Sequence, residues 1–178
     1  MDQQSNIYVV TGRIQSGKTT FLSELVRALK EKKNEVAGFL SKGQSQDGER
    51  LGFTLVNVQD GSEILLASRE NTKTWLRYGR FFFNPEAFAE GERIIKKAIA
   101  QESKLVILDE VGPLEMEAKG WADMLDILSK EKKGVQIWVV RENILDQVLE
   151  RWGIPRDQVI LAESMKIEDT IKRIYPHG

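Results

Sequence analysis

The chain has 178 residues and a formal net charge of only −1, because 26 Lys and Arg residues nearly balance 27 Asp and Glu residues. This length is typical of a single domain, 1–178, and a hydrophobic fraction of 41% is enough for a buried core. The absence of cysteine excludes a disulfide framework, a thiolate zinc site, an iron–sulfur cluster and a cysteine nucleophile. The nearly neutral charge argues against a nucleic-acid partner, since proteins built for that task usually carry a clear basic excess.

The beginning of the chain shows no sign of a targeting or membrane segment. Residues 1–6 are polar, and the longest apolar runs have the length of a strand rather than of a membrane span. We therefore expect a cytoplasmic protein with no membrane partner. We also expect a monomer, and the sequence identifies no protein partner.

Apolar runs of strand length alternate with segments of helical periodicity along most of the chain. This alternation predicts an α/β fold with a mainly parallel sheet flanked by helices. The expected elements are strands at 7–11, 36–41, 105–109, 135–140 and 158–161, and helices over about 21–34, 85–100, 118–130, 143–152 and from about 167 onward.

The alternation is interrupted in the middle of the chain. The segment 42–50 is polar and contains glycine, and it separates the strand expected at 36–41 from the next apolar run. The runs 51–58 and 63–67 flank Asp60-Gly61, a dipeptide that favours a hairpin turn. These two runs therefore predict an antiparallel pair of strands inserted into the parallel pattern.

A second irregular stretch follows this hairpin. The segment 68–80 is locally basic and is expected to be a less regular connection. The run 81–83 consists of three phenylalanines and predicts a short buried strand. Asn84 is expected to cap the next helix, with Pro85 as its first residue.

A phosphate-binding pattern comes directly after the first expected strand. Residues 12–19 satisfy G-x-x-x-x-G-K-[ST], with an apolar strand before them and an amphipathic helix after them. Glycines let the backbone curl so that successive amides point at a phosphate, and the start of the helix adds the positive end of its dipole. We expect a nucleoside triphosphate to bind through Gly12, Arg13, Ile14, Gln15, Ser16, Gly17, Lys18, Thr19 and Thr20.

Three side chains of this loop have more specific expected roles. Lys18 is expected to lie along the β- and γ-phosphates as a catalytic cation, and the Thr19 hydroxyl to be a ligand of Mg²⁺. Thr20 is expected to hydrogen-bond the α-phosphate. The alternative, a chance glycine turn before a helix, is disfavoured by the strand and the helix that flank the pattern.

The strand at 105–109 ends in two carboxylates, Asp109 and Glu110. Open α/β sheets bind their ligands at the carboxyl ends of parallel strands. We expect Asp109 to hold Mg²⁺, through a water molecule, and Glu110 to orient or deprotonate the water that attacks the γ-phosphate. Without the phosphate loop, the same strand end would be interpreted as an ordinary polar turn.

The residues 12–20 together with Asp-Glu-Val-Gly-Pro-Leu-Glu at 109–115 resemble the P-loop nucleoside-triphosphatase family that includes the cancer-related nucleoside triphosphatase. This resemblance implies a RecA-like core with an added strand between the two nucleotide motifs. It also implies Mg²⁺-dependent hydrolysis of ATP, GTP and other nucleoside triphosphates to diphosphates. Family members tend to place a His-Arg-like pair after the strand 135–140, where this chain has Arg141-Glu142.

Hydrolysis develops negative charge on the transferring phosphoryl group, and an arginine often neutralises it. Four arginines are candidates, and Arg80 and Arg141 are preferred over Arg13 and Arg77. Arg141 follows the strand that is expected to neighbour the acidic one, and Arg80 precedes the phenylalanine run. The alternative for each is a solvated surface arginine.

Two functions other than hydrolysis remain open at this point. Small nucleoside and nucleotide kinases share the loop, the size and the parallel core, with 42–50 or 68–80 as possible mobile covers of the site. A nucleotide-dependent switch would act through a partner, and a guanine-specific switch would normally show [NT]-K-x-D. The chain offers only Thr-Lys-Thr-Trp at 72–75, so no preference for one base is encoded.

Overall fold

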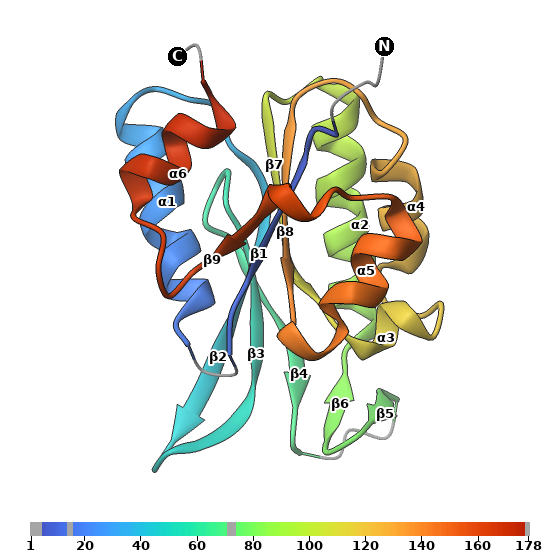
Figure 1. The fold of residues 1–178 in the computed structure, drawn as a ribbon. Helices are drawn as coiled ribbons and strands as arrows, with labels where there is room; N and C mark the ends of the chain where they lie inside the picture. The colour runs from blue at the N-terminus through green and yellow to red at the C-terminus, as the bar shows by residue number, and fades with distance from the viewer. Residues whose placement is uncertain (1–4, 14–15, 71–73, 177–178) are drawn as a thin grey trace.

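The computed structural model describes residues 5–13, 16–70 and 74–176 of the chain. Within these residues, nine strands form one sheet in the order β5-β6-β4-β3-β2-β7-β8-β1-β9, with helices on both faces (Figure 1). The strands are β1 (Ile7–Thr11), β2 (Ala37–Gln46), β3 (Glu49–Asn57), β4 (Glu63–Ser68), β5 (Leu76–Tyr78), β6 (Phe81–Phe83), β7 (Leu105–Val111), β8 (Val135–Val140) and β9 (Val159–Leu161). The expected α/β fold, with a parallel core and an antiparallel insertion, is confirmed.

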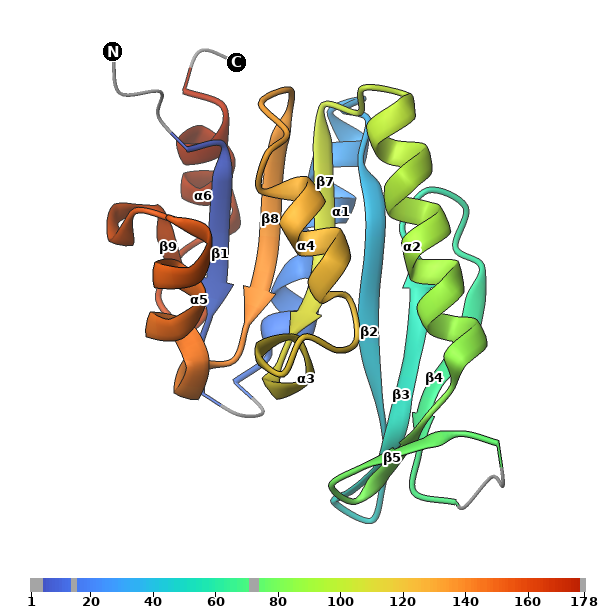
Figure 2. The same ribbon diagram turned by 90° about the vertical axis from the view of Figure 1, so that its right-hand side faces the viewer.

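The helices cover the sheet in two layers. One face carries α1 and α6, and the opposite face carries α2, α4 and α5 (Figures 1 and 2). The helices are α1 (Lys18–Glu31), α2 (Pro85–Ala100), α3 (Pro113–Met116), α4 (Ala122–Leu128), α5 (Leu145–Trp152) and α6 (Ile167–Ile174), with 3₁₀ turns η1 (Glu142–Ile144) and η2 (Arg156–Gln158). No helix in the described part of the chain is long and apolar enough to cross a membrane.

Five neighbouring strands, β2, β7, β8, β1 and β9, run parallel to one another. A row of fully buried side chains crosses four of them in register: Phe39, Leu108, Trp138 and Val9. Because the strands are parallel, their carboxyl ends meet at one edge of the sheet. The strand β8 lies between β1 and β7, as the family resemblance implied.

The remaining strands form an antiparallel half that joins the parallel half at β2. The strand β2 pairs in parallel with β7 and antiparallel with β3, and the expected hairpin at 51–58 and 63–67 is confirmed as β3 and β4. The strand expected at 36–41 is longer than predicted, because β2 continues to Gln46 and pairs with β3 from Glu49. Asp47 and Gly48 both have positive φ, as a two-residue hairpin turn requires, so they let the two strands extend beyond the core.

The segment before α2 is also more regular than expected. Residues 76–78 form β5, which pairs with β6. The phenylalanines of β6 are half-buried rather than buried, because β5 and β6 lie at the border of the sheet with little packed over them. Asn84 caps α2 as predicted, since its side chain accepts a hydrogen bond from the backbone N–H of Glu86 and Pro85 begins the helix.

Helices at the other end of the chain are shorter than expected. The segment expected to be helical from 118 to 130 forms α4 only from Ala122 to Leu128, preceded by α3 directly after β7. The helix expected from 143 begins as the 3₁₀ turn η1 and becomes α5 at Leu145. Both corrections place additional turns at the carboxyl edge of the sheet, next to the acidic strand end.

Candidate active site

The phosphate-loop residues lie at the carboxyl edge of the sheet, between β1 and α1. Thr11 ends β1, and its hydroxyl donates a 2.8 Å hydrogen bond to the carbonyl oxygen of Val140, which ties the start of the loop to β8. Gly17 has φ +82 and stands immediately before α1, a conformation that L side chains rarely adopt. The backbone therefore turns into the helix at Gly17 and leaves the N-terminus of α1 facing the edge. The expected ligands Ile14 and Gln15 lie outside the described residues.

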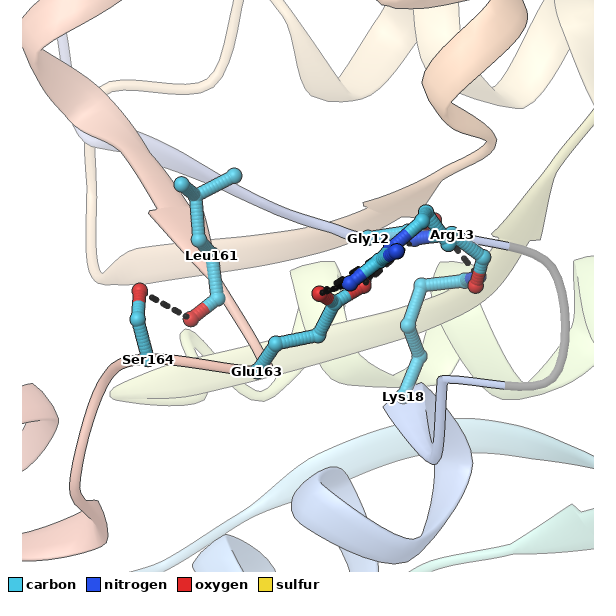
Figure 3. Close-up of polar contacts among 6 residues, drawn as sticks. All are labelled: Gly12, Arg13, Lys18, Leu161, Glu163 and Ser164. Atoms are coloured by element: carbon cyan, nitrogen blue, oxygen red, sulfur yellow. Dashed lines mark hydrogen bonds and ion pairs between the residues drawn. The ribbon is translucent and has the colours of Figure 1, made fainter.

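Lys18 is the first residue of α1 and points back over the loop (Figure 3). Its Nζ donates hydrogen bonds to the carbonyl oxygens of Gly12 at 3.0 Å and Arg13 at 2.9 Å, and the residue is only 9% exposed. Both acceptors are neutral, so the positive charge remains available to an anion at the loop. This is the charge and the position that a bound β- or γ-phosphate requires.

Thr19 and Asp109 come together although they are 90 residues apart in the sequence. The Thr19 hydroxyl donates to Asp109 Oδ2 at 3.3 Å, and the backbone N–H of Ser41 donates to the same oxygen at 3.1 Å. Burial raises the pKa of the Asp109 carboxyl to about 7, with the negative charge of Glu110 as a further cause, while the two hydrogen bonds act against the shift. A cation bound at this oxygen would favour the ionised carboxylate.

The pair of Thr19 and Asp109 fits Mg²⁺ by the chemistry of its donors. A hydroxyl and a carboxylate are the hard oxygen ligands that Mg²⁺ prefers, and this ion commonly keeps several waters and takes phosphate oxygens of its substrate. Among the described residues, no group of three or more His, Cys, Asp or Glu side chains could hold a metal alone. The donor set therefore suits a metal that arrives with a nucleotide.

Glu110 and Arg141 form an ion pair at the ends of two neighbouring strands. The Arg141 Nε donates to Glu110 Oε1 at 2.5 Å, and β7 and β8 are paired in parallel up to Val111 and Val140. Arg141 thus follows the strand that neighbours the acidic one, as predicted. Glu110 is half-buried and Arg141 is 40% exposed at its side chain, so both groups face the same opening at the edge of the sheet.

A cavity of about 990 Å³ connects these groups with the antiparallel half of the sheet. The residues that line it on the parallel side include Lys18, Thr19, Thr20, Glu110 and Arg141. On the opposite side it is lined by the β2–β3 hairpin and by the turn that joins β5 to β6. The cavity therefore brings together groups from both halves of the molecule.

The arginine candidates are separated by the structure. Arg141 contacts Glu110, whereas Arg80 is exposed on the far wall of the cavity with its guanidinium carbon 5.3 Å from the centre of the Phe81 ring. Arg77 does not line this cavity and lies over Phe82. Arg13 is exposed and paired with Glu163, outside the group formed by Lys18, Asp109 and Glu110.

Glu163 is a residue of the site that sequence reasoning did not find. Its carboxylate accepts from the backbone N–H of Arg13 at 2.9 Å and from the Arg13 guanidinium at 3.0 Å (Figure 3). The hydrogen bonds lower the pKa of the Glu163 carboxyl below its usual range. They attach the beginning of the phosphate loop to the segment after β9, and no local motif in the sequence signals this pairing.

Glu115 is a second such residue, and it is 3% exposed. Its carboxylate accepts from the backbone N–H groups of Gly112 at 2.8 Å and Trp121 at 3.1 Å, and burial raises its pKa to about 7. These bonds fix the segment between β7 and α4, which forms one wall of the cavity. The sequence shows the carboxylate but not its partners, because they are backbone amides.

A parallel sheet, a glycine loop leading into α1 and paired carboxylates at the end of β7 together define the class of the P-loop nucleoside triphosphatases. The family model described as NTPase matches residues 7–169. The chain therefore belongs to this NTPase family, and the resemblance found in its sequence motifs is confirmed.

Curated relatives match over most of their own length. Nucleoside-triphosphatase THEP1 of Archaeoglobus fulgidus is 33% identical over 141 residues, which cover 78% of this chain and 81% of the relative. Nucleoside-triphosphatase THEP1 of Methanopyrus kandleri is 31% identical over 170 residues, which cover 92% and 91% of the two chains.

Two solved structures share the fold. THEP1 from the hyperthermophile Aquifex aeolicus matches with a TM-score of 0.72 and 19% identity, covering 95% of this chain and 99% of that one. A human cancer-related nucleoside triphosphatase matches with a TM-score of 0.72 and 17% identity, covering 96% and 98%. The likeness extends to the antiparallel half, since nearly the whole chain is covered.

Proposed function

We propose that this protein hydrolyses nucleoside triphosphates, ATP and GTP among them, to diphosphate and phosphate with Mg²⁺ as cofactor. The observation that carries the proposal is the convergence of Lys18, Thr19, Asp109 and Glu110 at one edge of the sheet. The names of the curated relatives support the same activity.

The proposed binding site is the phosphate loop and the N-terminus of α1. The backbone amides before α1 and the positive end of the helix dipole hold the β-phosphate, and the Lys18 ammonium exchanges its carbonyl acceptors for phosphate oxygens. Thr19 and Asp109 would hold Mg²⁺, which would supply positive charge next to the phosphates. Ser41 keeps Asp109 in place through its backbone N–H.

In the chemical step, Glu110 receives the proton of a water molecule whose oxygen attacks the γ-phosphorus. The bond between that phosphorus and the bridging oxygen to the β-phosphate breaks, and the nucleoside diphosphate leaves. Arg141, which is already bonded to Glu110, orients this carboxylate and supplies positive charge next to the reacting phosphoryl group. Arg80 lines the same cavity and adds a second positive charge from the antiparallel side.

The test is phosphate release from ATP, GTP, CTP and UTP, each with Mg²⁺ and with excess chelator, and with no added acceptor. We expect release from several of the four triphosphates and its loss on chelation. A strict requirement for a nucleoside or sugar co-substrate would contradict hydrolysis and indicate a kinase. Slow turnover that a protein partner accelerates would favour a nucleotide-dependent switch.

A further inference from the structure

One part of the cavity lining is built from aromatic rings. Five rings from three different elements and one loop line it, and we call this part of the cavity the aromatic chamber: Phe53, Phe81, Phe83, Phe88 and Trp121. Their ring centres are 5.3 Å apart for Phe53 and Phe81, 5.9 Å for Phe83 and Phe88, and 4.8 Å for Phe88 and Trp121.

Packing of the hydrophobic core does not account for these rings completely. Phe53, Phe81, Phe83 and Phe88 are only half-buried, although each touches another aromatic ring. Phe81 and Phe83 lie on one face of β6 because side chains alternate along a strand, and this face lines the cavity. These rings therefore keep apolar surface in contact with water, and a ligand that covers this surface would gain binding free energy.

Three cationic side chains lie at the chamber. Arg50 lies with its guanidinium carbon 5.3 Å from the centre of the Phe53 ring, Arg80 stands over Phe81, and Lys42 lines the same cavity. One carboxylate also lies there, because Glu115 accepts a hydrogen bond from the backbone N–H of Trp121, but it is only 3% exposed. The chamber therefore combines aromatic faces with more cations than carboxylates.

The proposed binding mode of the triphosphate leaves the chamber free. In that mode the α-phosphate lies next to Thr20 in α1, and the γ-phosphate lies next to Glu110 at the end of β7. In the order of the strands the chamber lies beyond β7, over β3 and β6 and on the α2 face. The proposed mode therefore places the nucleoside on the side of the loop away from the aromatic rings.

We infer that the aromatic chamber binds a second small molecule, a planar aromatic anion, at the same time as the triphosphate. Pockets for one small ligand have volumes of about 300–1,000 Å³, and the cavity, at about 990 Å³, has the volume of two such pockets only if each lies in the lower half of that range. Aromatic faces favour a planar ring, and the three cations favour a negative group on it. The inference rests on the proposed function only for the position of the triphosphate.

The first experiment uses calorimetry with 2-naphthoate as the probe and its neutral analogue 2-naphthamide as the control. The protein is saturated with Mg²⁺ and the β,γ-imido analogue of GTP before each titration. We expect naphthoate to bind the loaded protein with a dissociation constant within about threefold of that for the free protein, and about fivefold tighter than naphthamide. Competition between naphthoate and the GTP analogue would assign the chamber to the nucleotide, and absence of naphthoate binding at millimolar concentration would also overturn the inference.

The second experiment compares two substitutions on opposite faces of β6. Phe81→Leu removes a ring from the chamber, and Phe82→Leu makes the same change on the face that carries Arg77. We expect naphthoate affinity of the loaded protein to decrease about tenfold for Phe81→Leu and less than about twofold for Phe82→Leu. Equal losses of naphthoate affinity in the two variants would contradict a site in the chamber. Melting temperatures equal to that of the wild type show that both variants are folded.

The third experiment tests the negative group of the ligand. Arg50→Gln leaves Arg80 and Lys42 in place, so it is expected to weaken naphthoate by about twofold to threefold, part of its advantage over naphthamide, without affecting naphthamide. Equal weakening of both probes would contradict recognition of the charge. These measurements are independent of phosphate release, so the inference and the proposed hydrolysis can fail separately.

Discussion

The parallel and antiparallel halves of the sheet contribute different chemistry to one cavity. The parallel half supplies the phosphate loop, Asp109 and Glu110, all within a few residues of strand ends. The antiparallel half supplies three aromatic rings, Phe53, Phe81 and Phe83, and cations from the β2–β3 hairpin and from the turn between β5 and β6. Under the two proposals, the parallel half binds and cleaves the triphosphate, and the antiparallel half contributes most of the site for the second ligand.

The largest effect is expected in the parallel half, at the loop lysine. Lys18→Ala removes the charge that faces the β- and γ-phosphates, so the affinity for Mg²⁺–nucleotide is expected to decrease by more than about 100-fold. Calorimetry with the β,γ-imido analogue of GTP measures this loss. Lys104→Ala, a change of the same type in an exposed residue beyond the opposite end of β7, is the control and should not alter the affinity.

The next prediction concerns the strand that joins the two halves. Gly38 in β2 has φ +108, and a Cβ added there would lie 1.9 Å from the carbonyl oxygen of Ile107 in β7. Gly38→Ala is therefore expected to decrease the free energy of unfolding by about 3 kcal/mol or more, and the melting temperature by about 6–12 °C.

A matched glycine in the hairpin turn provides the control for this prediction. Gly48 also has positive φ, but a Cβ added there meets nothing within 4 Å. Gly48→Ala is expected to cost only about 1 kcal/mol, from backbone strain. Thermal unfolding measures the free energy of unfolding of both variants. Equal losses for Gly38→Ala and Gly48→Ala would show that the close approach of β2 and β7 does not require glycine at position 38.

A smaller effect distinguishes the two arginines that line the cavity from opposite halves. Arg141→Ala removes the partner of Glu110 and is expected to decrease kcat by about 100-fold, whereas Arg80→Ala is expected to decrease it by about tenfold. Steady-state phosphate release measures both, and Arg77→Ala outside the cavity is the control. A wild-type kcat in both Arg141→Ala and Arg80→Ala would show that neither arginine stabilises the transition state.

The smallest effect is expected at the hairpin of β2 and β3. A Cβ added at Gly43 would collide with the Arg50 Nη1 atom, which belongs to the mobile end of a long side chain. Gly43→Ala is therefore expected to change the melting temperature by less than about 2 °C and to leave the KM for GTP within about twofold. A large rise of that KM would show that the antiparallel half also holds the triphosphate.

The sequence predicts the parallel half well because its signals are local. A glycine loop between a strand and a helix, and carboxylates at a strand end, have the same meaning in any open α/β sheet. The strand 7–11 and the capped start of α2 at Pro85 are reproduced at the predicted residues.

The antiparallel half was predicted less well because tertiary pairing determines it. The polar segment 42–50 becomes strand through its pairing with β3, which outweighs its composition.

Glu115 and Glu163 have backbone or distant partners that no spacing in the sequence indicates. The aromatic chamber combines residues from β3, β6, α2 and the turn before α4, so its existence follows only from the fold.

The most direct test of the account is the turnover of Glu110→Gln, compared with wild type and with Glu142→Gln, which changes another carboxylate lining the same cavity. The account predicts that Glu110→Gln binds the β,γ-imido analogue of GTP within about threefold of wild type but releases phosphate about 10²- to 10⁴-fold more slowly. Glu142→Gln should keep the wild-type rate. Equal rates for Glu110→Gln and wild type would contradict the assignment of Glu110 as the group that activates water.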